Sequence, residues 1–177
     1  MVTIIFESHG TTLDNESHTS SGWNDAALSP LGEKQSKELS DRYKNQHIDT
    51  VYCSALQRSY RTGEIAFADR GIAIIKDARL NECNYGDLNG QASNVVELEK
   101  AKRIVTPFPN GESYEQTSAR MKAFLDDVAH KHQGQTIMII GHRATQYGLE
   151  HWINGVPLQK AIGASWKWQP GWKYILG

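Results

Sequence analysis

Cysteine is scarce in this chain of 177 residues, which contains only Cys53 and Cys83. Two cysteines cannot form the disulfide framework of a small secreted domain, so we interpret both as free thiols in a reducing compartment. No apolar run approaches the ~20 residues of a membrane span, and the chain does not start with a basic region and a long apolar stretch. We therefore expect a soluble, cytoplasmic protein with no membrane partner.

The chain also has no large excess of positive or of negative charge. The 19 Lys and Arg residues against 20 Asp and Glu residues give a net charge of −1, which does not indicate a nucleic-acid surface. Segment 166–175 alternates aromatic and polar residues and predicts edge strands around a turn. Its lysines and aromatic rings could stack on bases, but without another basic patch we expect no nucleic-acid partner. The length favours one domain over residues 1–177, and both a monomer and a homodimer remain open.

The sequence does contain a buried strand that ends in histidine. The apolar, β-branched run Val2–Phe6 predicts the strand, and the polar turn after it includes His9 and Gly10. Glycine lets the backbone approach a ligand, and the hydroxyl and amide groups that follow can donate to phosphate oxygens. An anion site at the carboxyl end of the strand is one interpretation. A histidine that only satisfies a turn carbonyl is the alternative.

The same pattern recurs far downstream, where the apolar run 136–140 is followed by glycine and His142. Two parallel strands that both end in histidine can bring the two imidazoles to one edge of a sheet. Between them in the chain, Arg58 and Glu82 each follow a further predicted strand. Together these side chains could supply a nucleophile, cationic clamps and a proton donor.

Hydrophobic periodicity and end signals predict the elements. The predicted strands are 2–6, 50–53, 72–75 and 136–140, and the predicted helices are 30–43, 55–68 with Ser54 as N-cap, 91–103, 114–131 and 145–153. Alternation of strands and helices predicts a three-layer α/β/α sandwich with a largely parallel sheet. The charged face of 91–103 is either a solvated face or a lid over a pocket.

Six short blocks in the chain resemble, in order, those of the histidine phosphatase superfamily, the group related to phosphoglycerate mutase. They are HGTTLDN at 9–15, SGWND at 21–25 with LSPLG at 28–32, CSALQR at 53–58 with Thr62, LNE at 80–82 with YG at 85–86 and LNG at 88–90, PNGES at 109–113, and GH at 141–142. A lone His-Gly is a weak signal, whereas six blocks in family order are a strong one.

The resemblance implies a phosphatase that acts on a small phosphate monoester without metal or cofactor. His9 would attack the phosphorus and become phosphorylated, while Glu82 would protonate the leaving oxygen and then activate water. Arg58 and His142 would hold the phosphate oxygens together with the loop of Thr12 and Asn15. The other substrate-binding positions that we expect are Ser8, Gly10, Gly22 and Arg143. An acceptor such as a carbonyl must fix the tautomer of His9.

One position departs from the family pattern. Ser8, preceded by Glu7, stands where the family has an arginine that binds phosphate with two donors, which one hydroxyl cannot match. Strand alternation should place Glu7 on the face opposite Phe6 and Ser8, away from the phosphate. We hypothesise that Arg143 partly replaces the missing guanidinium. A solvated arginine at a helix start is the alternative.

The activity within the family also has alternatives. Mutases usually carry longer insertions around the acid, whereas here only residues 83–108 separate Glu82 from Pro109, which favours a phosphatase. Mutase-type phosphotransfer remains the alternative enzyme. The loss of the arginine at position 8 also leaves open a degenerate module that binds a phosphorylated ligand without turning it over.

Overall fold

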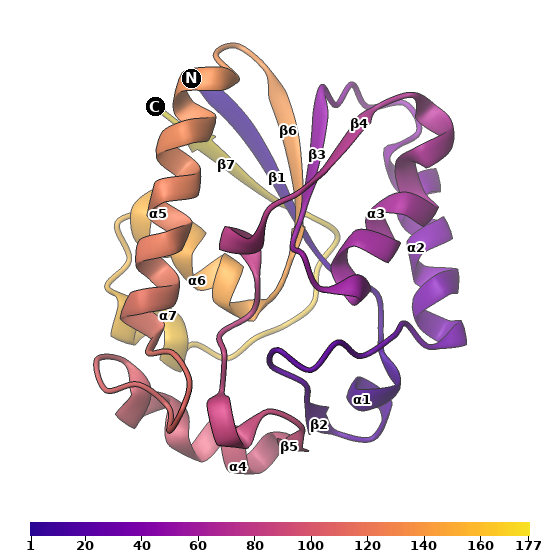
Figure 1. Ribbon diagram of the computed structural model, residues 1–177. Helices are drawn as coiled ribbons and strands as arrows, with labels where there is room; N and C mark the ends of the chain where they lie inside the picture. The colour runs from indigo at the N-terminus through magenta and orange to yellow at the C-terminus, as the bar shows by residue number, and fades with distance from the viewer.

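A five-stranded sheet forms the centre of the computed structural model, which describes residues 1–177 (Figure 1). Its strands lie in the order β4-β3-β6-β1-β7. All neighbours are parallel except β7, which runs antiparallel to β1 at the edge. The bounds are β1 (Val2–Ser8), β3 (Thr50–Cys53), β4 (Ala73–Lys76), β6 (Thr136–Gly141) and β7 (Trp172–Leu176). The sheet is therefore largely parallel, as the sequence predicts.

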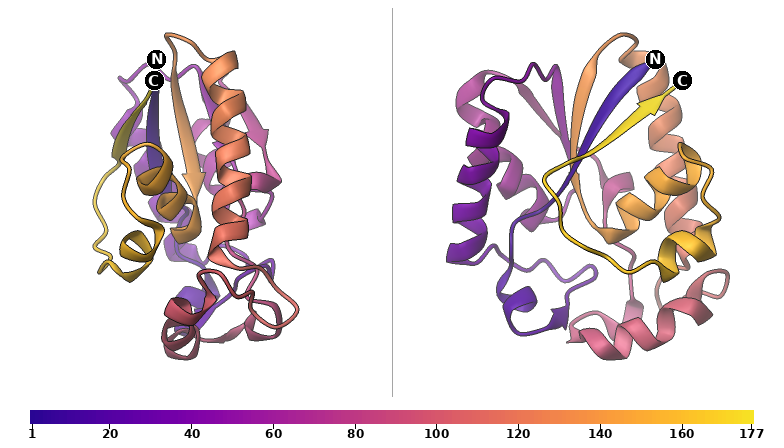
Figure 2. Two further views of the ribbon diagram at one scale, coloured as in Figure 1. Left: turned by 90° about the vertical axis from the view of Figure 1, so that its left-hand side faces the viewer. Right: turned by 180° about the vertical axis from the view of Figure 1, so that it is seen from behind.

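Helices cover both faces of this sheet (Figure 2). One face carries α2 (Pro30–Tyr43) and α3 (Gln57–Phe67), and the other carries α5 (Tyr114–Lys131) and α6 (Arg143–Trp152). In α2, Pro30 occupies the first turn and Ser29 accepts a hydrogen bond from the Gly32 N–H, as its sequence signals predict. The predicted three-layer sandwich is confirmed.

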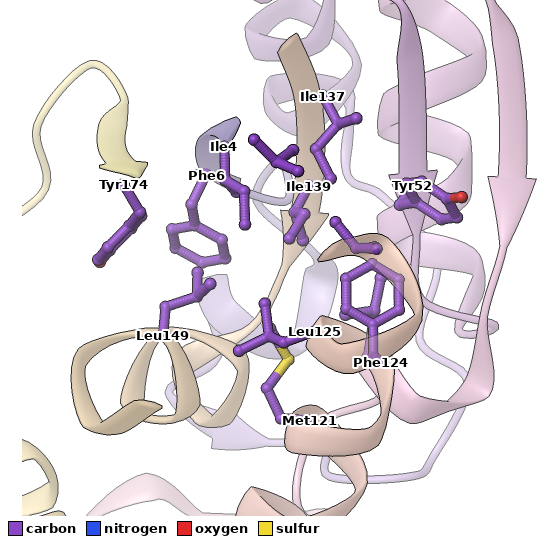
Figure 3. Close-up of a cluster of buried hydrophobic side chains, with 13 residues drawn as sticks. Ile4, Phe6, Tyr52, Met121, Phe124, Leu125, Ile137, Ile139, Leu149 and Tyr174 are labelled. Atoms are coloured by element: carbon purple, nitrogen blue, oxygen red, sulfur yellow. The ribbon is translucent and has the colours of Figure 1, made fainter. Parts of the chain in front are cut away.

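Strand alternation divides the apolar core between the two faces. Ile4 and Phe6 of β1 pack against α5 and α6, as Figure 3 shows, whereas Ile5 packs against α2 and α3. Burial of each side chain stabilises the fold by about 1.5–3 kcal/mol. None of the helices has the length and apolar character needed to cross a bilayer.

Short elements gather beyond the carboxyl ends of the parallel strands, at the bottom of Figure 1. They are α1 (Leu13–Glu16), β2 (Thr19–Ser20), β5 (Gln91–Ala92), α4 (Ser93–Glu99) and a 3₁₀ turn at Lys100–Arg103. Strands β2 and β5 pair with each other in a small antiparallel sheet. The segment 91–103 is therefore a short strand, a helix and a 3₁₀ turn rather than one helix.

Two further predictions were wrong in detail. The helix expected from residue 55 begins at Gln57, and its N-cap is Leu56 rather than Ser54. The tail holds one edge strand, β7, which begins just after a turn at Gly171 with φ of 72°, and residues 164–170 form no strand. A Cβ at Gly171 would lie 2.4 Å from the Tyr43 hydroxyl, so glycine suits both this turn and this close approach. The small helix α7 (Leu158–Gly163) precedes the tail.

Candidate active site

The two predicted histidines meet at the carboxyl ends of the two central strands. Strands β1 and β6 pair in a register that places Ser8 beside Gly141, and the His9 N–H donates to the Gly141 carbonyl at 3.2 Å. The centroids of the His9 and His142 rings lie 5.0 Å apart. The structure thus brings together two imidazoles that are far apart in sequence, because each one directly follows a central parallel strand.

His9 is a neutral imidazole with one ring nitrogen free. Its Nδ1 lies 2.7 Å from the Gly10 carbonyl oxygen, so this nitrogen carries the proton and Nε2 keeps a free lone pair. Burial, and then the charge of Arg58, lowers the pKa of His9 to about 3, although the bond to Gly10 opposes this shift. The ring is therefore uncharged at neutral pH.

The ring of His142 is oriented by Ser54. Its Nε2 lies 2.7 Å from the Ser54 hydroxyl oxygen, which already accepts a hydrogen bond from the Leu56 N–H at 3.2 Å. The Ser54 hydroxyl can donate to Nε2, and in that arrangement the proton of His142 lies on Nδ1. That Nδ1 is buried without a protein partner. With the proton on Nδ1, this nitrogen can donate to an anion, and Ser54 orients His142 rather than capping a helix.

Arg58 lies in the first turn of α3, near the positive end of the helix dipole. Its side chain donates to the carbonyl oxygens of Gly22 at 2.7 Å and Asn24 at 3.1 Å, and the residue is only 3% exposed. It takes part in no ion pair. A buried guanidinium that is held by backbone carbonyls retains its positive charge for an anionic ligand.

Only one of the two carboxyl oxygens of Glu82 is held by hydrogen bonds. Its Oε1 accepts hydrogen bonds from the N–H groups of Cys83 at 2.8 Å and Ala144 at 3.2 Å, whereas Oε2 has no protein partner. Its carbonyl oxygen accepts from Arg120 at 2.9 Å and from the Trp23 indole at 2.7 Å. One carboxyl oxygen is therefore held in place while the other is free to exchange a proton.

The hydrogen bond from Arg120 to the Glu82 carbonyl oxygen was not predicted from the sequence. This residue of α5 pairs with Glu112 at 2.9 Å and also donates to the carbonyl oxygens of Arg79 and Asn81. It lies 38 residues beyond Glu82, and an arginine on an amphipathic helix carries no local signal for such a role.

A cavity of about 1060 Å³ opens over these groups. This volume is at the upper end of ordinary ligand pockets. The predicted site residues on its wall are Ser8, His9, Gly10, Asn15, Gly22, Arg58, Glu82, His142 and Arg143. Glu97, Lys100 and Ile104 also line it, so the segment that follows β5 forms part of the cavity wall.

Thr12 is the one predicted site residue that does not line the cavity. It is fully buried, and its hydroxyl accepts a hydrogen bond from the Asn15 N–H at 3.0 Å. The Asn15 side chain accepts in turn from the Thr12 N–H, which completes a capping box at the start of α1. Thr12 thus holds the loop that carries Asn15, and we leave it out of the ligand contacts.

Glu7 lies on the face of the sheet that strand alternation predicts, but it still lines the cavity. It is 2% exposed on the side of α2, where its Oε1 accepts from Arg42 at 2.8 Å and from the Tyr43 hydroxyl at 2.7 Å. Burial raises the pKa of Glu7, although its bonds to Tyr43 and Arg42 act in the opposite direction. The carboxylate beside the missing arginine is therefore held by two donors of its own.

Arg143 is the first residue of α6, and its side chain extends along the helix to Tyr147. Its guanidinium donates to the Tyr147 hydroxyl, with Nη2 at 3.0 Å and Nε at 3.3 Å, and its carbon lies 5.3 Å from the centre of the Trp166 ring. The rings of Tyr147 and Trp166 both hold the arginine by cation–π contact. It is held on the cavity wall and remains partly exposed.

The architecture defines a class: an α/β protein with two facing histidines at the carboxyl edge of a largely parallel sheet. Residues 4–167 match the family model of the histidine phosphatase superfamily (branch 1). The chain belongs to this superfamily.

Known proteins resemble this chain over most of its length. Phosphoserine phosphatase 1 of Hydrogenobacter thermophilus is 32% identical over 90% of this chain and 80% of its own. A phosphoglycerate mutase of Schizosaccharomyces pombe is 30% identical over 78% of this chain and 73% of its own. Among solved structures, Bacillus stearothermophilus YhfR has a TM-score of 0.86 at 22% identity and covers 96% of this chain and 88% of its own. The structural likeness supports the fold.

Because His9 and His142 are buried and burial lowers their pKa values, we expect the free energy of unfolding to decrease in acid. His9 has a pKa of about 3 when folded and ordinarily ~6.5 when unfolded, so the unfolded state binds more protons below pH ~6.5. Stability is unaffected above this pH and falls progressively down to pH ~3. His9 alone accounts for about 2 kcal/mol at pH ~5, and His142, whose pKa burial also lowers, adds to it.

Denaturant unfolding at pH 7 and pH 5, without phosphate, measures this loss. Glu7 acts in the opposite direction, because its raised pKa favours the folded state as the pH falls. The comparison is therefore with a His9→Asn/His142→Asn double variant, which keeps Glu7. We expect the wild type to lose at least ~2 kcal/mol more than the double variant. Equal losses would show that the histidines are not neutral in the folded protein.

Proposed function

We propose that this protein is a phosphoric monoester hydrolase of the histidine acid phosphatase type, which hydrolyses a small phosphate ester through a phosphohistidine on His9. One observation carries the proposal. His9 keeps a free Nε2 lone pair while the donors of Arg58 and His142 lie beside it, so a nucleophile and an anion clamp share one cavity. The relatives named phosphoserine phosphatase and phosphoglycerate mutase are consistent with this chemistry.

The first step transfers the phosphoryl group to the protein. Nε2 of His9 attacks phosphorus in line, and the bond from phosphorus to the ester oxygen breaks. Protonated Glu82 delivers its proton from the free Oε2 to that oxygen, so the leaving group departs as a neutral alcohol. Arg58 and Nδ1 of His142 stabilise the charge on the phosphoryl oxygens.

The second step releases phosphate. Glu82, now a carboxylate, accepts a proton from water, and the water oxygen bonds to phosphorus. The bond between phosphorus and Nε2 breaks, and its electron pair returns to the ring. His9 is again neutral with its proton on Nδ1, where the Gly10 carbonyl holds it, and Glu82 is protonated for the next turnover.

Phosphate release from p-nitrophenyl phosphate between pH 5 and 8, without added metal, tests this proposal. Base quenching during turnover should retain a phosphoryl group on His9, because phosphohistidine is stable in base and labile in acid. Incubation with 3-phosphoglycerate separates the alternatives, since a phosphatase frees phosphate and a mutase returns an isomerised ester. No turnover of any ester would refute the hydrolase.

Ser8 is the observation that favours a second candidate, a module that binds a phosphorylated ligand without catalysis. Ser8 lines the cavity but offers one hydroxyl in place of a forked guanidinium. Four of the groups that the mechanism needs are nevertheless present: His9, Arg58, Glu82 and His142. We therefore regard the lost arginine as a reason for slow or selective turnover rather than for none.

The Ser8→Arg variant should raise kcat/KM for p-nitrophenyl phosphate by about tenfold to hundredfold. A guanidinium at this position adds charge-assisted hydrogen bonds to the phosphate, each stronger than a neutral one. Steady-state kinetics of wild type and variant measure the gain, and Ser8→Lys, which adds charge without the fork, is the matched control. Phosphate binding by both proteins without turnover by either would favour the binding module.

A further inference from the structure

The basic side chains on the cavity wall are not all neutralised. They are Arg42, Arg58, Lys100 and Arg143. Arg42 pairs with Glu7 at 2.8 Å and Lys100 pairs with Glu97 at 2.5 Å, whereas Arg58 and Arg143 take part in no ion pair. The proposed mechanism assigns Arg58 to the transferred phosphate. Arg143 is thus a second guanidinium on the cavity wall without a carboxylate.

Arg143 is held in position by groups that do not neutralise it. Tyr147 accepts from its Nε and Nη2, and the ring centres of Tyr147 and Trp166 lie 5.2 Å and 5.3 Å from its guanidinium carbon. Nη1 makes no hydrogen bond, so donors remain available for a ligand. A guanidinium fixed in this way can bind an anion with little loss of side-chain entropy.

Lys100 brings another positive charge to the same point. Its Nζ donates to the Tyr147 hydroxyl at 3.3 Å, so Arg143 and Lys100 share one phenol oxygen as acceptor. Lys100 is 8% exposed, whereas the side chain of its partner Glu97 is 62% exposed. Two cations and one mostly solvated carboxylate leave this corner of the cavity positive.

This corner of the cavity adjoins a second hollow. Arg143 borders this second hollow of about 380 Å³, which is also lined by residues 164–167 of the tail. Residues 164–166 line both hollows and the Arg143 guanidinium packs on the Trp166 ring, whereas His9 follows the central strand β1.

We propose that Arg143 and Lys100 form a subsite for a second anionic group, carried by the part of the substrate that leaves as the alcohol. The inference rests on the proposed phosphatase function and narrows its substrate class. The substrate is a small organic phosphate that also bears a carboxylate or a second phosphate. In this assignment Arg143 binds the leaving part of the substrate and does not replace the arginine missing at position 8.

Matched ester pairs test the subsite. O-phosphoserine and O-phosphoethanolamine differ by one carboxylate, and fructose 1,6-bisphosphate and fructose 6-phosphate differ by one phosphate. We expect the wild type to prefer the more anionic member of at least one pair by about tenfold to hundredfold in kcat/KM, the effect of one charge-assisted contact. The pair that shows the preference identifies the second anion.

The Arg143→Met variant keeps the length of the side chain and removes its charge. It should lose the preference, so that its kcat/KM for the more anionic member falls toward its own value for the less anionic member, and a circular dichroism spectrum like that of the wild type shows that it folds. Arg61→Met is the control, because Arg61 is exposed, pairs with Glu64 and lies outside the cavity. This control should keep the preference.

Two results would overturn the subsite: a wild type that prefers neither member of either pair, or an Arg143→Met variant that loses activity equally on both members. Equal loss would assign Arg143 to the transferred phosphate. If no ester is hydrolysed, calorimetry with the same compounds separates the two proposals. Tighter binding of O-phosphoserine than of O-phosphoethanolamine, abolished in Arg143→Met, would support the subsite although the phosphatase proposal had failed.

Discussion

Replacement of His9 by asparagine is expected to reduce phosphate release by ~10⁴-fold or more, because it removes the atom that attacks phosphorus. The asparagine amide can still donate to the Gly10 carbonyl, so the turn that follows β1 should remain intact. The measurement is kcat for p-nitrophenyl phosphate together with the amount of base-stable phosphoprotein, and both should fall to background.

His130→Asn is the matched control for this variant. His130 is exposed on α5, and its ring bonds only to the Asp126 carbonyl of the same helix. Its replacement should leave kcat within about twofold, as surface substitutions usually do. If His9→Asn kept more than a tenth of the wild-type rate, the nucleophile would have to be sought elsewhere in the cavity.

The Glu82→Gln variant is expected to show an effect that depends on the leaving group. Glutamine keeps an oxygen that can accept from the Cys83 and Ala144 N–H groups, but it cannot transfer a proton. Hydrolysis of an alkyl phosphate such as glycerol phosphate should fall by about 10²–10⁴-fold, the usual contribution of general acid–base catalysis. Nitrophenolate leaves without protonation, so the first turnover of p-nitrophenyl phosphate should slow by less than about tenfold.

Rapid-mixing kinetics separate the two steps in this variant. Because Glu82 also activates water, the first turnover of the aryl ester should give a burst of nitrophenol and then stall with His9 phosphorylated. An aryl burst and an alkyl rate that fell by the same factor would mean that Glu82 only shapes the cavity.

The sequence predicted those parts of the site that lie next to strands. The apolar runs before His9 and His142 allow little except buried parallel strands, and parallel strands bring their carboxyl ends to one edge. The face of the sheet on which Glu7 lies was also predicted, because successive side chains of a strand point to opposite faces.

Side chains whose partners are distant in sequence were harder to predict. Ser54 has the residue type and place of an N-cap, but its hydroxyl bonds to His142, which no local pattern indicates. Thr12 matches a phosphate-binding motif, although its hydroxyl is used within the capping box of α1. Arg120 supports Glu82 from another helix, and only the folded chain places it there.

The position of β1 within the sheet sets the order in which the site can form. His9 is synthesised well before β6 and β7, the only strands with which β1 pairs. A nascent chain that has emerged only as far as α5 holds the nucleophile, Arg58 and Glu82, but not the strands on either side of β1. Formation of the candidate site must therefore follow the synthesis of β6 and β7, although His9 is the earliest of its proposed catalytic residues to be made.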